Sequence, residues 1–264
     1  MGIFEALILG IIQGLTEFLP VSSSGHIELG KAILNIQTSD NLLYSIVVHA
    51  ATALSTIIVF RKTIFDIFKG LLEFKNNESL HYTLKIILSM IPVGIIGVLF
   101  EEKLEALFTG NVLLVGSMLV LTGILLTFTY FSKKTIKDIS YGRAFVIGIA
   151  QAIAILPGVS RSGSTISTAL ILGVDKEKAT RFSFIMVLLP ILGATLLKLK
   201  DYFETPSLAG GISATALVIG FVAAFISGLL ACTWMISIVK KGKLIYFAYY
   251  CFAIGLISIF VALI

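Results

Sequence analysis

Six segments of this chain are apolar enough and long enough to cross a lipid bilayer. They cover approximately residues 42–60, 82–100, 111–131, 180–198, 212–236 and 244–264. A hydrocarbon core about 30 Å thick requires roughly 20 apolar residues in a helix. Hydrophobic residues make up 57% of the chain and charged residues only 13%, about half the ~25% usual in soluble domains. The sequence therefore predicts an all-α integral membrane protein with six transmembrane helices, and it argues against a soluble enzyme, a disordered chain or a disulfide scaffold.

Two further apolar regions, 2–34 and 143–173, are each interrupted by a polar break. The first breaks at Pro20 and the serines that follow it, and the second breaks at Pro157 and the segment 158–164. Each half of these regions is too short for a comfortable crossing. Irregular backbone at membrane depth is tolerated only where protein surrounds it or where it lines a cavity. We therefore expect two re-entrant helical hairpins in addition to the six crossings.

Basic residues in the connecting segments predict the orientation. Of the 20 Lys and Arg residues, 14 lie in the segments 61–81, 132–143, 174–181 and 237–243. By contrast, the connecting segments 35–41, 101–110 and 199–211 are poor in Lys and Arg. If both interrupted regions are re-entrant, all basic segments fall on one side of the membrane, which the positive-inside rule makes cytoplasmic. Both termini then face outward.

Short sequence motifs repeat between the two halves of the chain. The pattern GIxQ at 10–13 recurs at 148–151, and VSxSG at 21–25 recurs at 159–163. Both pairs have one offset, the distance from Gly10 to Gly148. We therefore expect one compact membrane domain built from two repeats, 1–131 and 141–264, each with one hairpin and three crossings. Because three is odd, the second repeat is inverted, and inverted repeats place their broken helices together near the midplane.

The first break carries a carboxylate, an imidazole and several hydroxyls. Gln13 and Glu17 are four residues apart and share one helix face. An ionisable group inside a membrane segment is by default a functional hypothesis. A capped helix start with an incidental histidine is the alternative. The candidate residues of this break are Gln13, Glu17, Ser22, Ser23, Ser24, Gly25 and His26.

The second break combines an arginine with glycines and small hydroxyl residues. Such residues at a helix N-terminus form an anion cradle, and the planar fork of arginine suits bidentate contact with phosphate. An arginine that snorkels to the interface is the alternative, which the position of Arg161 inside the break disfavours. The candidate residues of this break are Ser160, Arg161, Ser162, Gly163 and Thr165.

Together the two breaks favour phosphoryl transfer on a lipid phosphate. Arginine and backbone amides would hold phosphate, histidine could attack or donate a proton, and glutamate could orient the histidine or bind a cation. Because Glu17 and His26 flank Pro20, we expect the turn to bring them together as a coupled pair. Cys232 and Cys251 lie in apolar stretches without a metal or redox motif, and no basic stripe indicates a nucleic-acid partner.

The segments QGLTEFLPVSSSGH (13–26) and PGVSRSGST (157–165) resemble the (E/Q)xxxE and PGxSRSxxT signatures of the bacterial undecaprenyl-diphosphate phosphatase family of the bacitracin-resistance type. The resemblance covers the whole chain. It implies hydrolysis of undecaprenyl diphosphate to the monophosphate at the outer side of the bacterial plasma membrane, which recycles the carrier lipid for peptidoglycan and other envelope polymers. It also implies the fold with two re-entrant helix pairs and six crossings.

The resemblance further implies roles for individual residues. Glu17, Ser23, His26 and Arg161 match the catalytic set, and the remaining candidates of both breaks bind substrate. The family's dependence on Mg²⁺ or Ca²⁺ makes Glu17 a candidate metal ligand, although Gln13 removes one carboxylate; no organic cofactor is implied. The sequence leaves open whether Ser23 or His26 is the nucleophile. It also leaves the oligomeric state open, with a homodimer as one option.

A transporter or carrier-lipid flippase is the competing class. Inverted repeats with broken helices at the midplane also describe secondary transporters, and a flippase would need a phosphate cradle as well. His49 lies within a predicted crossing, where we expect a packed, hydrogen-bonded side chain.

Overall fold

The computed structural model describes residues 1–264 apart from 35, 37–41, 101–102, 105, 108–109, 133–135 and 205–211, and apart from the side chains of 42, 198–199 and 201–204. The described part of the chain forms helices and no β-strand, and its one β-type contact is an isolated parallel bridge between Lys137 and Val174. Five of its helices are long and apolar enough to cross a membrane, or six if one bent pair forms a single span. The predicted all-α membrane class is confirmed.

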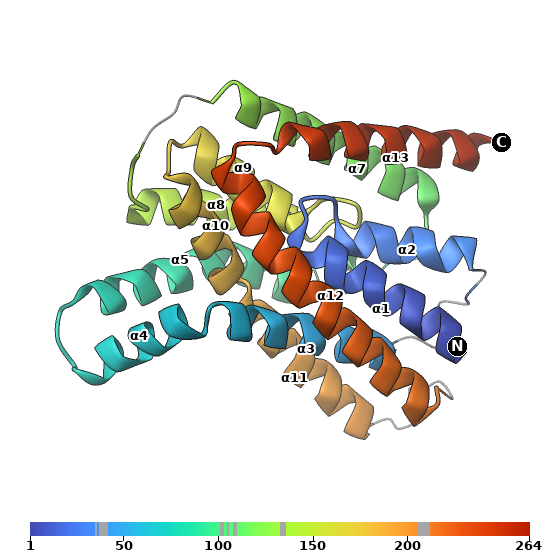
Figure 1. The fold of residues 1–264 in the computed structure, drawn as a ribbon, viewed down its shortest axis with the longest axis horizontal. Helices are drawn as coiled ribbons and strands as arrows, with labels where there is room; N and C mark the ends of the chain where they lie inside the picture. Colours follow the sequence, from blue (N-terminus) through green and yellow to red (C-terminus); the bar gives the residue numbers. More distant parts are fainter. Residues whose placement is uncertain are drawn as a thin grey trace.

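The two interrupted regions each form a pair of short helices (Figure 1). Helices α1 (Ile3–Phe18) and α2 (Ser23–Ile33) make the first hairpin, and α8 (Tyr141–Ile153) and α9 (Arg161–Ile171) make the second. Their lengths are 16, 11, 13 and 11 residues, which is less than the roughly 20 residues that a crossing needs. The predicted helix–break–helix pattern of both regions is confirmed.

Long apolar helices surround these hairpins. They are α3 (Leu42–Val59), α5 (Glu78–Leu99), α7 (Val112–Tyr130), α12 (Ala214–Lys240) and α13 (Ile245–Leu263). Helices α10 (Lys176–Met186) and α11 (Leu188–Glu204) follow one another across Val187, and 176–197 has the length and hydropathy of one span. Each predicted crossing therefore corresponds to one of these helices or to this pair.

Helix α4 (Arg61–Leu72) occupies a segment that the sequence analysis treats only as a basic connection. It follows α3 at a bend of 76°. Its exposed residues include Phe65 and Phe68 beside basic and acidic side chains, so it is an amphipathic helix. A count of the basic residues in this segment takes no account of their spacing, so this helix is not predicted from the sequence.

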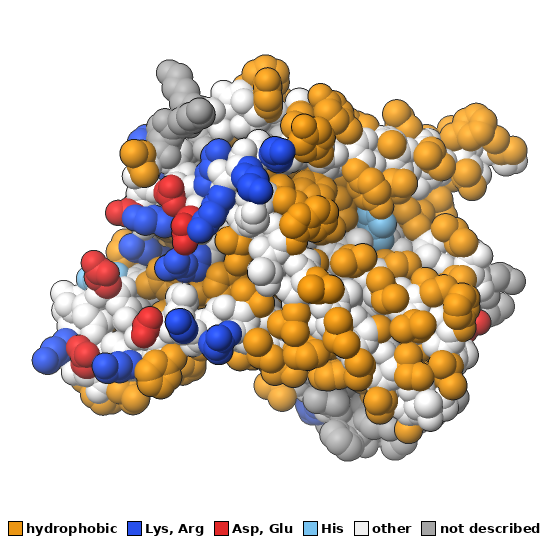
Figure 2. Space-filling view, viewed as in Figure 1, with side chains coloured by type: hydrophobic (Ala, Val, Ile, Leu, Met, Phe, Trp, Pro, Cys, Tyr) orange, Lys and Arg blue, Asp and Glu red, His pale blue; other side chains and the backbone are white. Residues whose placement is uncertain are grey.

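The basic connections meet at one end of the molecule. Lys178 forms an ion pair with Asp138, and Lys240 lies 3.0 Å from Glu177. His81, at the start of α5, contacts the Tyr141 hydroxyl at 2.6 Å. These contacts join the segments 61–81, 132–143, 174–181 and 237–243. Figure 2 shows Lys and Arg side chains gathered at one end of the visible face, while hydrophobic side chains cover much of the rest. The four basic connections thus lie together in the fold, and their side of the membrane stays a prediction.

The first helix of each hairpin packs against a long helix from the other half of the chain. Helix α1 lies on α12, and α8 lies on α5. Glycines make both approaches close: a Cβ on Gly10 would lie 2.6 Å from the Gly220 carbonyl oxygen, and one on Gly148 would lie 2.4 Å from the Ser89 carbonyl oxygen. Small residues at membrane helix interfaces allow this contact between backbones.

Replacing Gly148 by alanine should destabilise the protein because the added methyl group meets backbone atoms of α5, which cannot move aside as a flexible side chain can. We expect a loss of about 1–3 kcal/mol, the usual cost of overpacking, measured as a lower midpoint of thermal unfolding in detergent. Gly142→Ala on the same helix is the matched control, since nothing lies within 4 Å of the place that its new Cβ would take. Equal midpoints for both variants would contradict the proposed close contact of α8 with α5.

Candidate active site

The two breaks touch each other at the centre of the fold. A Cβ on Gly25 would lie 3.0 Å from the Gly158 Cα atom, so only a side chain as small as hydrogen fits between the two turns without displacement. The Ser162 hydroxyl donates a hydrogen bond to the Leu19 carbonyl oxygen at 3.0 Å. Residues from regions more than one hundred positions apart in the chain are thereby held in one site.

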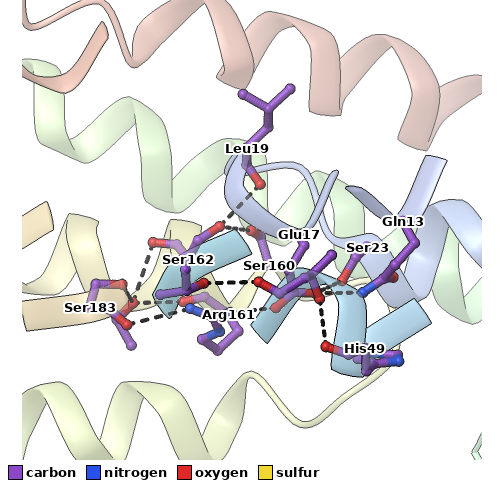
Figure 3. Close-up of polar contacts among 12 residues, drawn as sticks. Gln13, Glu17, Leu19, Ser23, His49, Ser160, Arg161, Ser162 and Ser183 are labelled. Carbon is purple, nitrogen blue, oxygen red and sulfur yellow. Dashed lines mark hydrogen bonds and ion pairs between the residues drawn. The ribbon is translucent and has the colours of Figure 1, made fainter. Parts of the chain in front are cut away.

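A buried ion pair joins the hairpins. Arg161 Nη2 lies 2.5 Å from Glu17 Oε1, and the two side chains are 15% and 9% exposed. Glu17 lies in the last turn of α1, and Arg161 is the first residue of α9. Figure 3 shows Glu17 between Arg161 and the pair Ser23 and Gln13. Burial of one of these charges without the other would cost free energy of folding. Each hairpin therefore supplies the counter-charge that allows the other hairpin to bury its own.

The second oxygen of the Glu17 carboxylate faces the first hairpin. The Ser23 hydroxyl donates to Glu17 Oε2 at 2.8 Å, and Gln13 Nε2 donates to the same oxygen at 3.1 Å. Gln13 is fully buried and its Oε1 has no hydrogen-bond partner. The predicted shared helix face of Gln13 and Glu17 is confirmed, and the carboxylate receives hydrogen bonds from three side chains.

Side-chain capping determines where α9 begins and so determines the position of its first residue, Arg161. Ser160 is the N-cap, and its hydroxyl accepts a hydrogen bond from the Gly163 amide at 3.0 Å. The Ser160 amide donates in turn to Thr122 Oγ1 on α7 at 3.1 Å. Behind the helix, Thr165 Oγ1 and Ser183 Oγ are 2.6 Å apart. The helix that presents the guanidinium is therefore anchored to both α7 and α10.

Helix α2 begins in the same manner. Ser22 is its N-cap, with the unusual φ of 71°, and its hydroxyl accepts from the Gly25 amide at 3.2 Å. Positive φ is uncommon for a residue with a side chain, and here it turns the chain sharply after Pro20. The Ser24 hydroxyl lies 3.3 Å from that of Ser22, and Ser23 is the first residue of α2, where it reaches Glu17.

The predicted direct pair of Glu17 and His26 does not form. His26 Nδ1 lies 2.8 Å from the Ser22 carbonyl oxygen, and Nε2 lies 2.8 Å from the Tyr250 hydroxyl. The expectation is wrong because Arg161, which comes from the other hairpin, takes the place beside the carboxylate. All other candidates of the two breaks lie at or next to the junction.

Sequence reasoning missed several residues of this site. Thr122, Ser183 and Tyr250 contact candidate residues but come from crossings that carry no motif. His49 on α3 is hydrogen-bonded, as the sequence analysis expects, since its Nδ1 lies 2.8 Å from the Ser45 carbonyl oxygen. Ser183 had one usable signal: it follows Ser45 by the offset that separates Gly10 from Gly148.

The side chains described here offer a divalent cation few free oxygen ligands. Mg²⁺ is commonly held by one or two carboxylates together with substrate phosphates and water, whereas Ca²⁺ takes six to eight oxygen ligands. Glu17 is the one carboxylate of this network, and Arg161, Ser23 and Gln13 already donate to it. No group of three or more His, Cys, Asp or Glu suited to a metal occurs among the residues that the structure describes.

Comparison with known proteins gives full-length matches. The family described as "Bacitracin resistance protein BacA" matches residues 6–257. A protein of Christiangramia forsetii named undecaprenyl-diphosphatase is 57% identical over 264 residues, which is 99% of each chain. Relatives with the same name from Bacteroides fragilis and Halothermothrix orenii are 54% and 41% identical, covering 98% and 99% of each chain.

The buried ion pair makes a prediction about stability. Arg161→Gln should destabilise the protein by about 3–5 kcal/mol because it leaves the Glu17 charge buried without its partner. Adding Glu17→Gln should recover much of this loss, since two neutral amides can pair. Thermal unfolding of Arg161→Gln, Glu17→Gln and the double variant in detergent measures the effect. A double variant with the summed losses of the two single variants would contradict a direct ion pair between the hairpins.

Proposed function

The chain belongs to the bacitracin resistance protein BacA family, and on this premise we propose that it hydrolyses undecaprenyl diphosphate to undecaprenyl phosphate and inorganic phosphate. The observation that carries the proposal is the junction of the two breaks, where Arg161, Glu17 and the Ser23 hydroxyl meet at the starts of two helices. The chain is a multi-pass membrane protein, so a substrate anchored in the bilayer can reach this depth.

The terminal phosphate binds at the N-termini of α2 and α9. Unpaired backbone N–H groups and the positive ends of helix dipoles favour an anion there. Arg161 adds a guanidinium fork that can bind two phosphate oxygens. Because this guanidinium pairs with Glu17, the diphosphate competes with the carboxylate for it. Substrate binding thereby frees Glu17 to accept a proton.

Ser23 is the nucleophile in this mechanism. Its hydroxyl already donates to Glu17 Oε2 at 2.8 Å, so the proton has an acceptor when the oxygen attacks the terminal phosphorus. A bond forms between Ser23 Oγ and this phosphorus, the bond from phosphorus to the bridging oxygen breaks, and undecaprenyl phosphate leaves with the electron pair. Arg161 neutralises charge on the transferred group.

Water completes the reaction. It attacks the phosphorus of the phosphoserine, and the bond from phosphorus to Ser23 Oγ breaks. Glu17 returns to Ser23 Oγ the proton that it accepted in the first step, and both protons of the water leave with inorganic phosphate as H₂PO₄⁻. The three hydrogen-bond donors around Glu17 and the hydroxyls of Ser160 and Ser162, which lie 3.3 Å apart, form the polar surroundings that such a charged intermediate needs.

The inverted repeat and the orientation are part of the proposal. Packing of α1 on α12 and of α8 on α5 supports two equivalent halves, 1–131 and 141–264. The basic end is cytoplasmic by the positive-inside rule, and the site opens to the outer face, where the plasma-membrane enzyme would meet the diphosphate released by envelope polymer synthesis.

Phosphate release by the purified protein tests the proposed activity. In detergent there is no second compartment, so a transporter or flippase gives no inorganic phosphate from undecaprenyl diphosphate, whereas a phosphatase does. Arg161→Lys should lower turnover by at least about a hundredfold, because lysine keeps the charge and loses the fork. Arg181→Lys, at an exposed position, is the control and should leave the rate unchanged. Normal turnover of Arg161→Lys would remove this residue from the mechanism.

Labelling of introduced cysteines tests the orientation. Ala106→Cys lies in the connection poor in net positive charge, and Lys241→Cys lies in a basic connection; both positions are exposed. The first variant should react with an impermeant thiol reagent on intact cells, and the second only after permeabilisation. The buried Cys232 and Cys251 should give little background. Reversed labelling would place the basic end outside and overturn the proposed topology.

A further inference from the structure

Both ring nitrogens of His26 have partners. Nδ1 lies 2.8 Å from the Ser22 carbonyl oxygen. A carbonyl oxygen can only accept, so Nδ1 carries a hydrogen and Nε2 is the acceptor nitrogen of the neutral ring. Nε2 lies 2.8 Å from the Tyr250 hydroxyl, which therefore donates to it. The two rings are nearly parallel, with planes 13° apart and centroids separated by 5.5 Å.

Tyr250 is held firmly in this position although it comes from the last helix. Its neighbour Cys251 donates from Sγ to the Pro20 carbonyl oxygen at 3.7 Å, which ties α13 to the first break. A Cβ on Gly116 of α7 would lie 2.9 Å from the Gly255 carbonyl oxygen of α13. The close contact of these two helices prevents α13 from sliding and keeps the tyrosine beside the histidine.

The contact determines how His26 can reach a substrate. His26 follows Ser23 by three residues on α2, so the two side chains share one helix face. Nε2 is the one ring nitrogen that could contact a phosphate or a water, and the Tyr250 hydroxyl occupies it. Any action of Nε2 must therefore pass through this hydroxyl or displace it.

We propose that Tyr250 and His26 act as one unit in which the tyrosine hydroxyl is the group that meets the diphosphate. When the imidazole is protonated, Nε2–H donates to the tyrosine oxygen, and the tyrosine O–H turns to donate to a phosphate oxygen. A hydroxyl both donates and accepts, so the contact with Nε2 persists in both protonation states of the ring. The Tyr250 side chain is 42% exposed, which leaves its hydroxyl room to turn. The inference rests on the proposed function.

Tyr250→Phe tests this unit in the purified protein. The variant keeps the ring beside His26 and loses the hydroxyl. We expect kcat for phosphate release to fall roughly tenfold, the scale of one lost hydrogen bond in the transition state, with KM changed much less. Tyr249→Phe is the matched control on the same helix, at an exposed position, and should behave as the unchanged protein. Unchanged or faster turnover of Tyr250→Phe would mean that substrate displaces the tyrosine, and this overturns the proposal.

A second measurement reads the contact without turnover. Diethyl pyrocarbonate modifies unprotonated imidazole nitrogen, and peptide mass spectrometry separates the chain's three histidines. His26 should be modified several times faster in Tyr250→Phe than in Tyr249→Phe, because Nε2 has lost its partner. His81, which pairs with Tyr141, should react at one rate in both. Equal rates at His26 would show that the contact is absent and overturn the proposal even if phosphate release is normal. Absence of phosphate release by the unchanged protein, with faster His26 modification in Tyr250→Phe, would reject the proposed function and the role toward diphosphate while leaving the contact in place.

Discussion

The ion pair between Glu17 and Arg161 is the interaction on which the rest of this structure depends. Each charge lies at the end or the start of a short helix, where its side chain is buried and could not remain unpaired at low cost. Pairing requires the ends of two hairpins from opposite halves of the chain to meet. The long helices then have to leave room for both breaks at the centre, and the glycine contacts of α1 with α12 and of α8 with α5 are how the packing achieves this.

The meeting of the two hairpins also explains why both breaks are rich in serine and glycine. The two turns are in contact at Gly25 and Gly158, so there is little space for side chains between them. Inside a membrane, each backbone N–H and C=O group of these turns also needs a hydrogen-bond partner within the protein. Small hydroxyl residues satisfy helix starts from within, as Ser22 and Ser160 do. The remaining first amides of α2 and α9 have no helical partner, and they are the groups to which the proposed function assigns the binding of phosphate.

Much of this could be predicted from the sequence, because the relevant signals are local. Helix lengths follow from apolar runs, the breaks follow from proline and serine, and the facing of Gln13 and Glu17 follows from a spacing of four. What sequence could not supply was the partner of each charged group, since partners come from distant helices. The sequence suggested His26, nine positions further along the chain, as the partner of Glu17. The packing of the two hairpins instead places Arg161 beside this carboxylate. Tyr250 stood in an apolar run with three other aromatic residues between 246 and 250, and no local pattern distinguishes it from them.

Gln13 shows how this chain balances the charge of its site with its own side chains. A glutamate there would place two carboxylates one helical turn apart beside a diphosphate, and like charges at that distance call for a cation between them. The amide of Gln13 instead donates a hydrogen bond to Glu17 at 3.1 Å, so the single negative charge is matched by the single positive charge of Arg161. The charges of this buried pair therefore cancel. An incoming diphosphate meets the guanidinium and two helix N-termini with only one carboxylate opposing it, and that carboxylate is the group that Ser23 needs as its proton acceptor.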